Sequence, residues 1–286
     1  MFKITPFIVY FAPMSLFISS INSGSNGNCY YVGNTREAVL VDAGISCSTI
    51  ERRMKEVHLD IQHVKAIFIS HEHIDHIKGV ETLSKKFNIP VYISETTYRS
   101  SGLDIEIGRL HYFTDDDLIT IGNLHVHTFS KIHDASDPFS FVVRDDEVQV
   151  GIFTDIGTCC NNLINWFRGC HAAFLESNYD EQMLQNGPYP YYLKKRISDG
   201  RGHLSNTIAH QLFADHRPEF MTHLILSHLS QQNNTPEIVE KLFSSVSDDV
   251  TITVAPRHQA TPVFEITTRE TKIIPAVTYQ QLRLDF

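Results

Sequence analysis

The sequence predicts an α/β fold in which two β-sheets face each other and helices cover both outer faces, a four-layer αββα sandwich. Short apolar segments of strand length occur in runs, with helical segments between the runs, in both halves of the chain. No low-complexity linker separates the halves. We therefore expect a single domain over residues 14–286, preceded by an N-terminal extension over residues 1–13.

The strands expected in the first half are short apolar runs bounded by turn residues. They cover residues 16–21, 29–32, 38–41, 64–70 and 91–93. Ser48 to Glu51 form a capping box, which predicts a helix whose apolar face carries Ile50, Met54 and Val57. A second helix is expected over residues 77–87, because proline introduces the next strand at residue 90.

The second half repeats this organisation. Its expected strands cover residues 118–121, 124–129, 139–143, 148–153, 172–176 and 222–227. Its expected helices cover residues 161–167, 204–214 and 236–243. The segment from residue 250 to the end is strand-like and carries no recognisable motif.

Composition excludes several classes of protein. With 42% hydrophobic and 20% charged residues, the chain is neither mainly disordered nor a coiled coil. No apolar run in its body is long enough to span a membrane. The net charge of −9 argues against bulk attraction to nucleic acid, yet it permits a nuclease, because bound divalent ions reverse the local field.

The chain is expected to be cytoplasmic. Its five cysteines are an odd number and include the adjacent pair Cys159 and Cys160, a poor basis for disulfides. The first 19 residues loosely resemble a signal peptide, but Pro6 and Pro13 interrupt them and no clear cleavage site follows.

Four potential metal ligands lie within six residues, directly after the strand expected over residues 64–70: His71, His73, Asp75 and His76. In an extended segment His71 and His73 point to the same side, so both imidazoles reach one ion. Asp75 and His76 fall on the following turn and reach a second ion. Zn, Mn and Fe all accept this mixture of imidazole and carboxylate. We therefore expect two divalent metal ions.

Three further candidates follow predicted strands: His133, Asp155 and His228. Each comes at or just after the end of a hydrophobic strand, the arrangement expected when a rigid sheet presents a site. Any one of them alone is equally well explained as a hydrogen-bonded polar residue. Together with the first motif, the three complete two metal shells.

In this order of residues the chain resembles the metallo-β-lactamase superfamily, which shows a strand-terminal Asp, an HxHxDH motif, a His, a bridging Asp and a final His. The resemblance implies that one ion binds His71, His73, His133 and Asp155. It implies that the other binds Asp75, His76, Asp155 and His228. Asp42, the strand-terminal Asp, would orient a ligand histidine.

Finer motifs resemble the WalJ-type (YycJ-type) family, bacterial proteins to which 5′-to-3′ exonuclease activity on double-stranded DNA is attributed. These are SGSNGNC at 23–29, IHDA at 132–135, FTDIG at 153–157, ESNYD at 176–180, GHLSN at 202–206 and LSHLSQQNN at 226–234. None of the five cysteines stands at a ligand position, unlike in true β-lactamases.

Two segments are candidate phosphate sites. The segment 202–206 is expected to open a helix, so its N–H groups, Ser205, Asn206 and His203 would bind a phosphate. His203 would stabilise charge on phosphorus or protonate the leaving oxygen. The loop 23–28 would hold a terminal 5′-phosphate through Ser23, Ser25, Asn26 and Asn28.

A basic cluster lies just before His203 and would follow a DNA backbone. It comprises Lys194, Lys195, Arg196 and Arg201.

The function expected from these residues is a two-metal phosphodiesterase acting as a 5′-to-3′ DNA exonuclease, with Asp75 and His203 catalytic and a metal-bridging hydroxide as nucleophile. DNA is the expected substrate, and neither a membrane nor a stable protein partner is indicated. The alternative is a metal-dependent hydrolase of a small thioester, lactone or cyclic nucleotide. A third hypothesis, a non-catalytic metal sensor, is disfavoured because every ligand position is filled.

Overall fold

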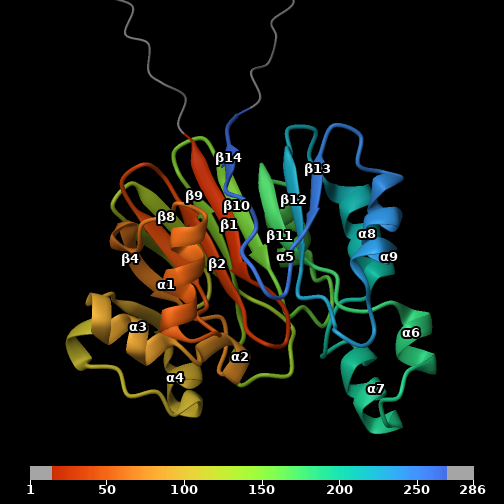
Figure 1. The fold of residues 1–286 in the computed structure, drawn as a ribbon, viewed down its shortest axis with the longest axis horizontal. Coiled ribbons are helices and arrows are strands. Elements are labelled where there is room, and N and C mark those ends of the chain that lie inside the picture. The colour runs from red at the N-terminus through yellow and green to blue at the C-terminus, as the bar shows by residue number, and fades with distance from the viewer. Residues whose placement is uncertain (1–14, 269–286) are drawn as a thin grey trace, which may run out of the picture.

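The structure, a computed structural model, describes residues 15–268; the extension expected over residues 1–13 lies outside the described residues. Two seven-stranded sheets face each other, with helices on both outer sides, and the predicted four-layer αββα sandwich is confirmed (Figure 1). Within residues 15–268 no helix is both long and apolar enough to cross a bilayer.

The first sheet has the strand order β14-β1-β2-β3-β4-β5-β6. These strands are β1 (Leu16–Asn22), β2 (Cys29–Gly33), β3 (Ala38–Val41), β4 (Val64–Phe68), β5 (Val91–Ser94), β6 (Leu110–Phe113) and β14 (Phe264–Ile266). From β3 to β6 the neighbours run parallel, so their carboxyl ends point to one end of the sandwich.

The second sheet has the order β13-β12-β11-β10-β9-β8-β7. Its strands are β7 (Leu118–Ile121), β8 (Leu124–Ser130), β9 (Phe139–Arg144), β10 (Gln149–Phe153), β11 (Ala172–Glu176), β12 (His223–Ser227) and β13 (Thr251–Val254). From β10 to β13 the neighbours are again parallel.

Helices cover the outer face of each sheet. The helices that precede the strands of the second sheet in the sequence are α1 (Cys47–Glu56), α2 (Ile74–Ile77), α3 (Val80–Phe87) and α4 (Glu95–Ser101). Later come α5 (Asn161–Phe167), α6 (Glu181–Asn186), α7 (Tyr191–Ser198), α8 (Asn206–His216) and α9 (Pro236–Ser244). Ile50 of α1 and Leu83 of α3 pack on the first sheet, and Phe213 of α8 packs on the second.

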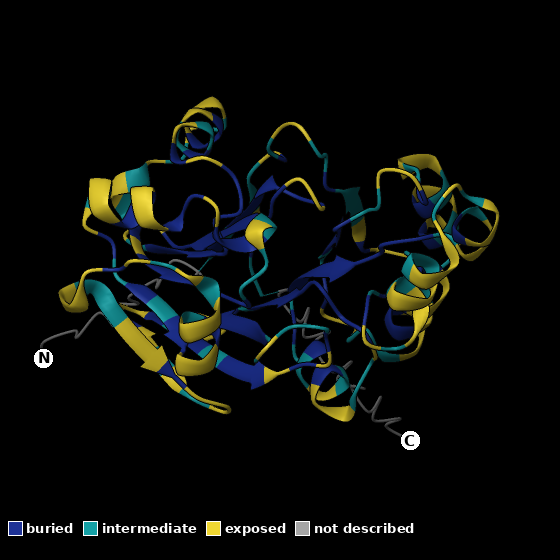
Figure 2. Ribbon diagram, turned by 90° about the horizontal axis from the view of Figure 1, so that it is seen from below, coloured by how far each residue is buried: buried dark blue, intermediate teal, exposed yellow. Residues whose placement is uncertain are grey.

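The central core lies between the sheets. The ring centroids of Tyr30 and Phe174 are 5.0 Å apart, and those of Phe68 and Phe141 are 5.6 Å apart. Figure 2 shows most of the strands as the buried centre and the helices as the exposed rim. Because this apolar layer is removed from water on both sides, it anchors the strands whose ends carry the site.

Most expected strands agree with the observed ones to within two residues, whereas several helices differ. Helix α1 is capped by Ser46, whose side chain accepts from Thr49 N, so it begins before the capping box expected at Ser48. The helix expected over 77–87 begins later, as α3 at Val80, because Ile77 ends α2 and Gly79 caps α3; an added Cβ at Gly79 would lie 2.1 Å from the Ile45 carbonyl oxygen.

Candidate active site

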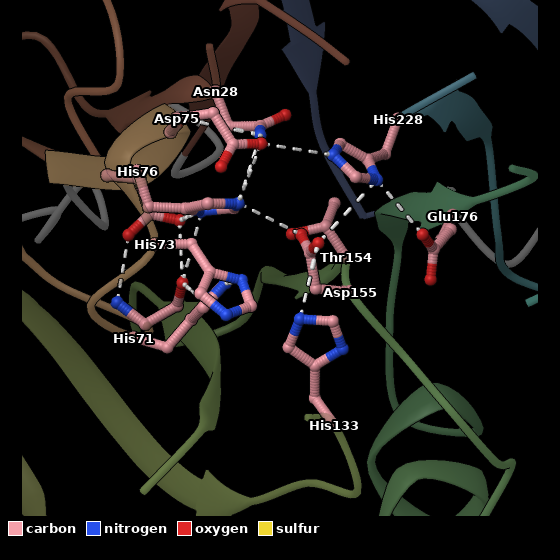
Figure 3. A network of polar contacts seen from close by, with 12 residues as sticks. Asn28, His71, His73, Asp75, His76, His133, Thr154, Asp155, Glu176 and His228 are labelled. Atoms are coloured by element: carbon pink, nitrogen blue, oxygen red, sulfur yellow. Dashed lines mark hydrogen bonds and ion pairs between the residues drawn. The ribbon is translucent and has the colours of Figure 1, made fainter. Parts of the chain in front are cut away.

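The site lies where strand ends of both sheets meet. Asp42 follows β3, Asp155 follows β10 and His228 follows β12. All three have left-handed backbone conformations, with φ of 61°, 54° and 56°. Such angles are uncommon for residues other than glycine, although Asp and His adopt them more readily than most. Figure 3 shows the side chains of Asp155 and His228 turned toward one centre, whereas Asp42 contacts His76 from outside it.

A first group of donors consists of His71, His73 and His133. Their ligand atoms all lie within 4.8 Å of one another. His71 Nε2 and His73 Nδ1 are 3.0 Å apart, and the rings of His71 and His133 are 4.9 Å apart. Three imidazoles so arranged fit one borderline cation such as zinc.

A second group consists of Asp75, His76 and His228, which also lie within 4.8 Å of one another. Asp155 lies between the two groups. Its Oδ2 is 3.2 Å from His76 Nε2, and its Oδ1 is 3.8 Å from His133 Nε2. The structure therefore brings together all seven residues that the sequence predicts as ligands.

Outer hydrogen bonds fix which nitrogen of each imidazole faces the centre. The Nδ1 of His76 lies 2.7 Å from Asp42 Oδ2, and that of His133 lies 2.8 Å from the Gly202 carbonyl oxygen. The Nδ1 of His228 lies 3.0 Å from Glu176 Oε1. Because oxygens accept these bonds, each Nδ1 carries a proton, and Nε2 is the nitrogen left available to a metal ion.

Unsatisfied atoms show that the residues fit a metal. His133 Nε2 and His228 Nε2 are buried and have no hydrogen-bond partner among the described residues. An unpaired polar atom in the interior costs free energy unless something binds it. Both atoms belong to donor groups that also contain carboxylate or further imidazole ligands. Divalent cations therefore fit this donor set.

The expected outer role of Asp42 agrees with its contacts. It is completely buried, and besides His76 it accepts hydrogen bonds of 2.8 Å from the backbone N–H and the hydroxyl of Ser70. Through these hydrogen bonds Asp42, at the end of β3, fixes the position of the ligand motif at residues 71–76.

Burial and charge separate the histidines by pKa. Burial lowers the pKa of His133 to about 4 and also lowers the pKa of His71 well below its usual range. These imidazoles are neutral at pH 7, the form that binds a cation. Burial also opposes the charged form of His228, but the negative charges around it, with Asp155 the strongest, raise its pKa to about 10.

Carboxylates in the site stay ionised. Burial alone would raise the pKa of Asp155, yet His228 and His76 lower it well below its usual range. Burial is similarly outweighed at Asp75, whose pKa is lowered by His76 and His228. The buried anions therefore need positive charge, which bound metal ions would supply.

Two important residues were not predicted from the sequence. Glu176, at the end of β11, is completely buried. Its Oε1 also accepts from His203 Nδ1 at 2.8 Å, and its Oε2 accepts from the backbone N–H groups of Ile156 and Leu204. Lys131 is also buried, and its Nζ donates to the Thr154 carbonyl oxygen at 2.7 Å.

A cavity of about 360 Å³ opens beside the donor groups. The metal-ligand candidates His73, Asp75, Asp155 and His228 line it, and so does His203. Its volume lies within the range of pockets that bind small ligands. The expected catalytic residues Asp75 and His203 thus border the same space.

Most of the side chains expected to bind phosphate contact other residues of the protein. Only Ser25 of the six candidates lines this cavity. The hydroxyl of Ser23 accepts from the His228 N–H, and Asn28 contacts Asp75 with its amide. The side chain of the exposed Asn26 pairs with Arg257.

The segment 202–206 leads into α8, which begins at Asn206. Ser205 caps α8 through a bond to Ile208 N, and buried Asn206 bonds to Asn234 and Ser177. These two side chains serve the fold, because their polar atoms are already paired in the interior. Of this segment, Gly202 and His203 border the cavity.

The comparisons with known proteins agree with this geometry. The family model of the metallo-beta-lactamase superfamily matches residues 23–184, more than half of the chain. Exodeoxyribonuclease YycJ of Bacillus anthracis is 34% identical over 241 residues, which covers 82% of this chain and 90% of that protein. Exodeoxyribonuclease WalJ of Streptococcus pneumoniae is 30% identical over 225 residues, covering 77% and 84% respectively.

Solved structures support the fold. The metallo-beta-lactamase fold protein YhfI from Bacillus subtilis superposes with a TM-score of 0.67 at 16% identity, covering 88% of this chain and 99% of that one. Together with the clustered donor groups, these matches make the protein a metal-dependent hydrolase. The chain belongs to the metallo-beta-lactamase superfamily and, within it, to the family of the exodeoxyribonucleases YycJ and WalJ.

Proposed function

We propose that the protein is a two-metal phosphodiesterase that degrades DNA from the 5′ end. The observation that carries the proposal is the pair of donor groups with Asp155 between them, at the wall of one cavity. The relatives named exodeoxyribonucleases cover most of the chain, which favours DNA over other esters as the substrate.

In this proposal His71, His73, His133 and Asp155 would hold one ion, and Asp75, His76, Asp155 and His228 would hold the other. Such ions supply a nucleophilic water of lowered pKa and neutralise charge on the phosphoryl oxygens. The protein holds the imidazoles in the required tautomer through Asp42, Gly202 and Glu176.

His203 is proposed to deliver a proton to the leaving oxygen. Its Nδ1 is bonded to the buried carboxylate of Glu176, so Nε2 is the nitrogen that exchanges protons with the cavity. When the P–O3′ bond breaks, water adds its oxygen to phosphorus and O3′ receives the proton. This role suits His203, because buried Glu176 fixes the orientation of its ring while the ring stays partly exposed to the cavity.

The experiment uses purified protein with Mn²⁺ or Zn²⁺ and a blunt DNA duplex labelled at the 3′ end of one strand. Degradation from the 5′ end shortens the labelled strand step by step, whereas degradation from the 3′ end releases the label at once. Asp75→Ala is the blank, because it removes a proposed ligand that also lines the cavity.

A ladder that shortens from the 5′ end in the wild type and is absent in the blank supports the proposal. Repeating the assay with and without a 5′-phosphate tests whether the end is recognised. No cleavage of DNA by metal-loaded protein, with turnover of a small thioester or cyclic nucleotide, would contradict it.

A further inference from the structure

Helix α7 is unusual among the helices. Of the α-helices within residues 15–268, it is the one without a buried side chain. Tyr191 and Tyr192, in its first turn, are 80% and 74% exposed. Leu193 and Ile197 are half-buried, so α7 gains less from packing than the helices with a buried face.

The two faces of α7 border two different hollows. Leu193, Arg196 and Ile197 line the catalytic cavity. Tyr191 and Lys195 line a second hollow of about 540 Å³, on the side toward α6. The spacing of three and four residues within each set places the sets on opposite sides of the helix.

The second hollow has walls of mixed chemistry. Tyr179 and Leu184 are its buried apolar members, and Tyr191 stands exposed beside them. Lys194 donates to the Gln185 carbonyl oxygen at 2.7 Å, which holds α7 against α6. Glu181 is the acidic residue among the lining side chains. The hollow thus offers aromatic and apolar surface next to lysine charge.

The charge on α7 is opposite to that of the protein. The chain has a net charge of −9, whereas α7 carries Lys194, Lys195 and Arg196 and no acidic residue. Exposed aromatic rings beside cations are the arrangement that binds unpaired nucleotides, because bases stack on the rings while phosphates contact the cations. In a duplex the stacked bases present no free face to such rings.

We propose that the exposed side of α7, which carries Tyr191, Tyr192 and Lys195, binds unpaired nucleotides of the DNA strand, with bases stacked on the two rings and a phosphate beside Lys195. This inference rests on the proposed nuclease function. The strand then passes along α7 between the second hollow and the catalytic cavity, where Arg196 pairs with Asp134 next to His133.

The test measures binding without turnover. A fluorescein-labelled oligothymidylate of about 12 nucleotides, within the range of single-strand site sizes, is titrated with protein in EDTA and followed by anisotropy. The variants are Tyr191→Ala/Tyr192→Ala and Lys195→Ala. Tyr112→Ala is the matched control, because Tyr112 is an exposed tyrosine on β6, a strand of the first sheet outside α7. Melting temperatures confirm that every variant is folded.

The double tyrosine variant is expected to bind the single strand at least roughly 5-fold more weakly, because stacking of one base on one aromatic ring raises the affinity by about that factor or more. Lys195→Ala is expected to lower the slope of log affinity against log salt by about 0.7. Tyr112→Ala binds like the wild type. A blunt duplex of equal length loses little affinity when the tyrosines are removed.

Equal affinity of the wild type and the double tyrosine variant for the single strand would overturn the inference. So would the absence of single-strand binding in the wild type, which would leave the face to a protein partner. If that wild type still shortens a duplex from the 5′ end, the proposed function stands and the α7 inference alone fails. If it cleaves no DNA, both fail.

Discussion

The buried carboxylate of Glu176 offers the sharpest single perturbation of the site. One of its oxygens accepts from the Nδ1 of His203 and of His228, at 2.8 and 3.0 Å. The other accepts from the backbone N–H groups of Ile156 and Leu204, at 2.6 and 3.2 Å. Glu176→Gln keeps an oxygen for the backbone but turns an NH₂ group toward the two imidazoles.

The new amide NH₂ group is a hydrogen-bond donor, and it would face the protonated Nδ1 atoms of His203 and His228, which are donors as well. To avoid the conflict, His228 must move its proton from Nδ1 to Nε2, which removes the lone pair proposed to hold a metal ion. Loss of such an outer partner weakens metal binding about 10- to 100-fold, roughly 1.4–2.8 kcal/mol. The backbone bonds survive, so the variant is expected to fold, but the melting temperature of the metal-free protein is expected to fall because Glu176 helps to stabilise charged His228.

The assay is competition for Zn²⁺ against a chromophoric chelator of known affinity. Glu37→Gln is the matched control, because Glu37 also accepts from a backbone N–H, that of Asn123, but lies outside the donor groups. Unchanged zinc affinity in Glu176→Gln would refute the tautomer argument. An equal loss in Glu37→Gln would refute its specificity.

Two further predictions concern stability. Burial opposes charge on His228, but Asp155 and the other anions around His228 raise its pKa from 6.5 to about 10. In the metal-free protein, charged His228 therefore stabilises the fold. This stabilisation is complete below pH 6.5 and is lost as the pH rises toward 10. Melting temperatures in EDTA should therefore fall between pH 6.5 and 9, and excess Zn²⁺ should remove this fall; identical pH dependence in both conditions would be evidence against it. In Gly44→Ala the new Cβ would lie 1.6 Å from the Asp75 carbonyl oxygen, so the ligand motif must shift. Overpacking of this kind costs about 1–3 kcal/mol, and a chemical denaturation midpoint equal to that of the wild type would show that the turn relaxes freely.

The strands and most of the site were predictable because both depend on local patterns. Apolar runs of four to seven residues are long enough to mark strands such as β4, β10 and β12. A polar residue of ligand type at the end of such a run then marks the site, as Asp155 and His228 do. This rule would also have found Glu176, which closes the apolar run of β11.

The remaining features depend on contacts between distant segments. Lys131 reads as an exposed loop residue until the fold buries it against the Thr154 carbonyl oxygen. Ser23 and Asn28 belong to a Gly- and Asn-rich segment that suggests a mobile loop, yet packing against the ligand residues buries both. Helix α7 has no apolar stripe facing a core, so hydrophobic periodicity could not find it.

The metal content of the protein tests the central claim most directly. Native mass spectrometry of protein reconstituted with Zn²⁺ or Mn²⁺ counts the ions in each folded chain. The account predicts two ions per wild-type chain and fewer in Asp155→Asn, because Asp155 lies between the two donor groups. A single ion in the wild type, or an unchanged count of two in Asp155→Asn, would contradict it.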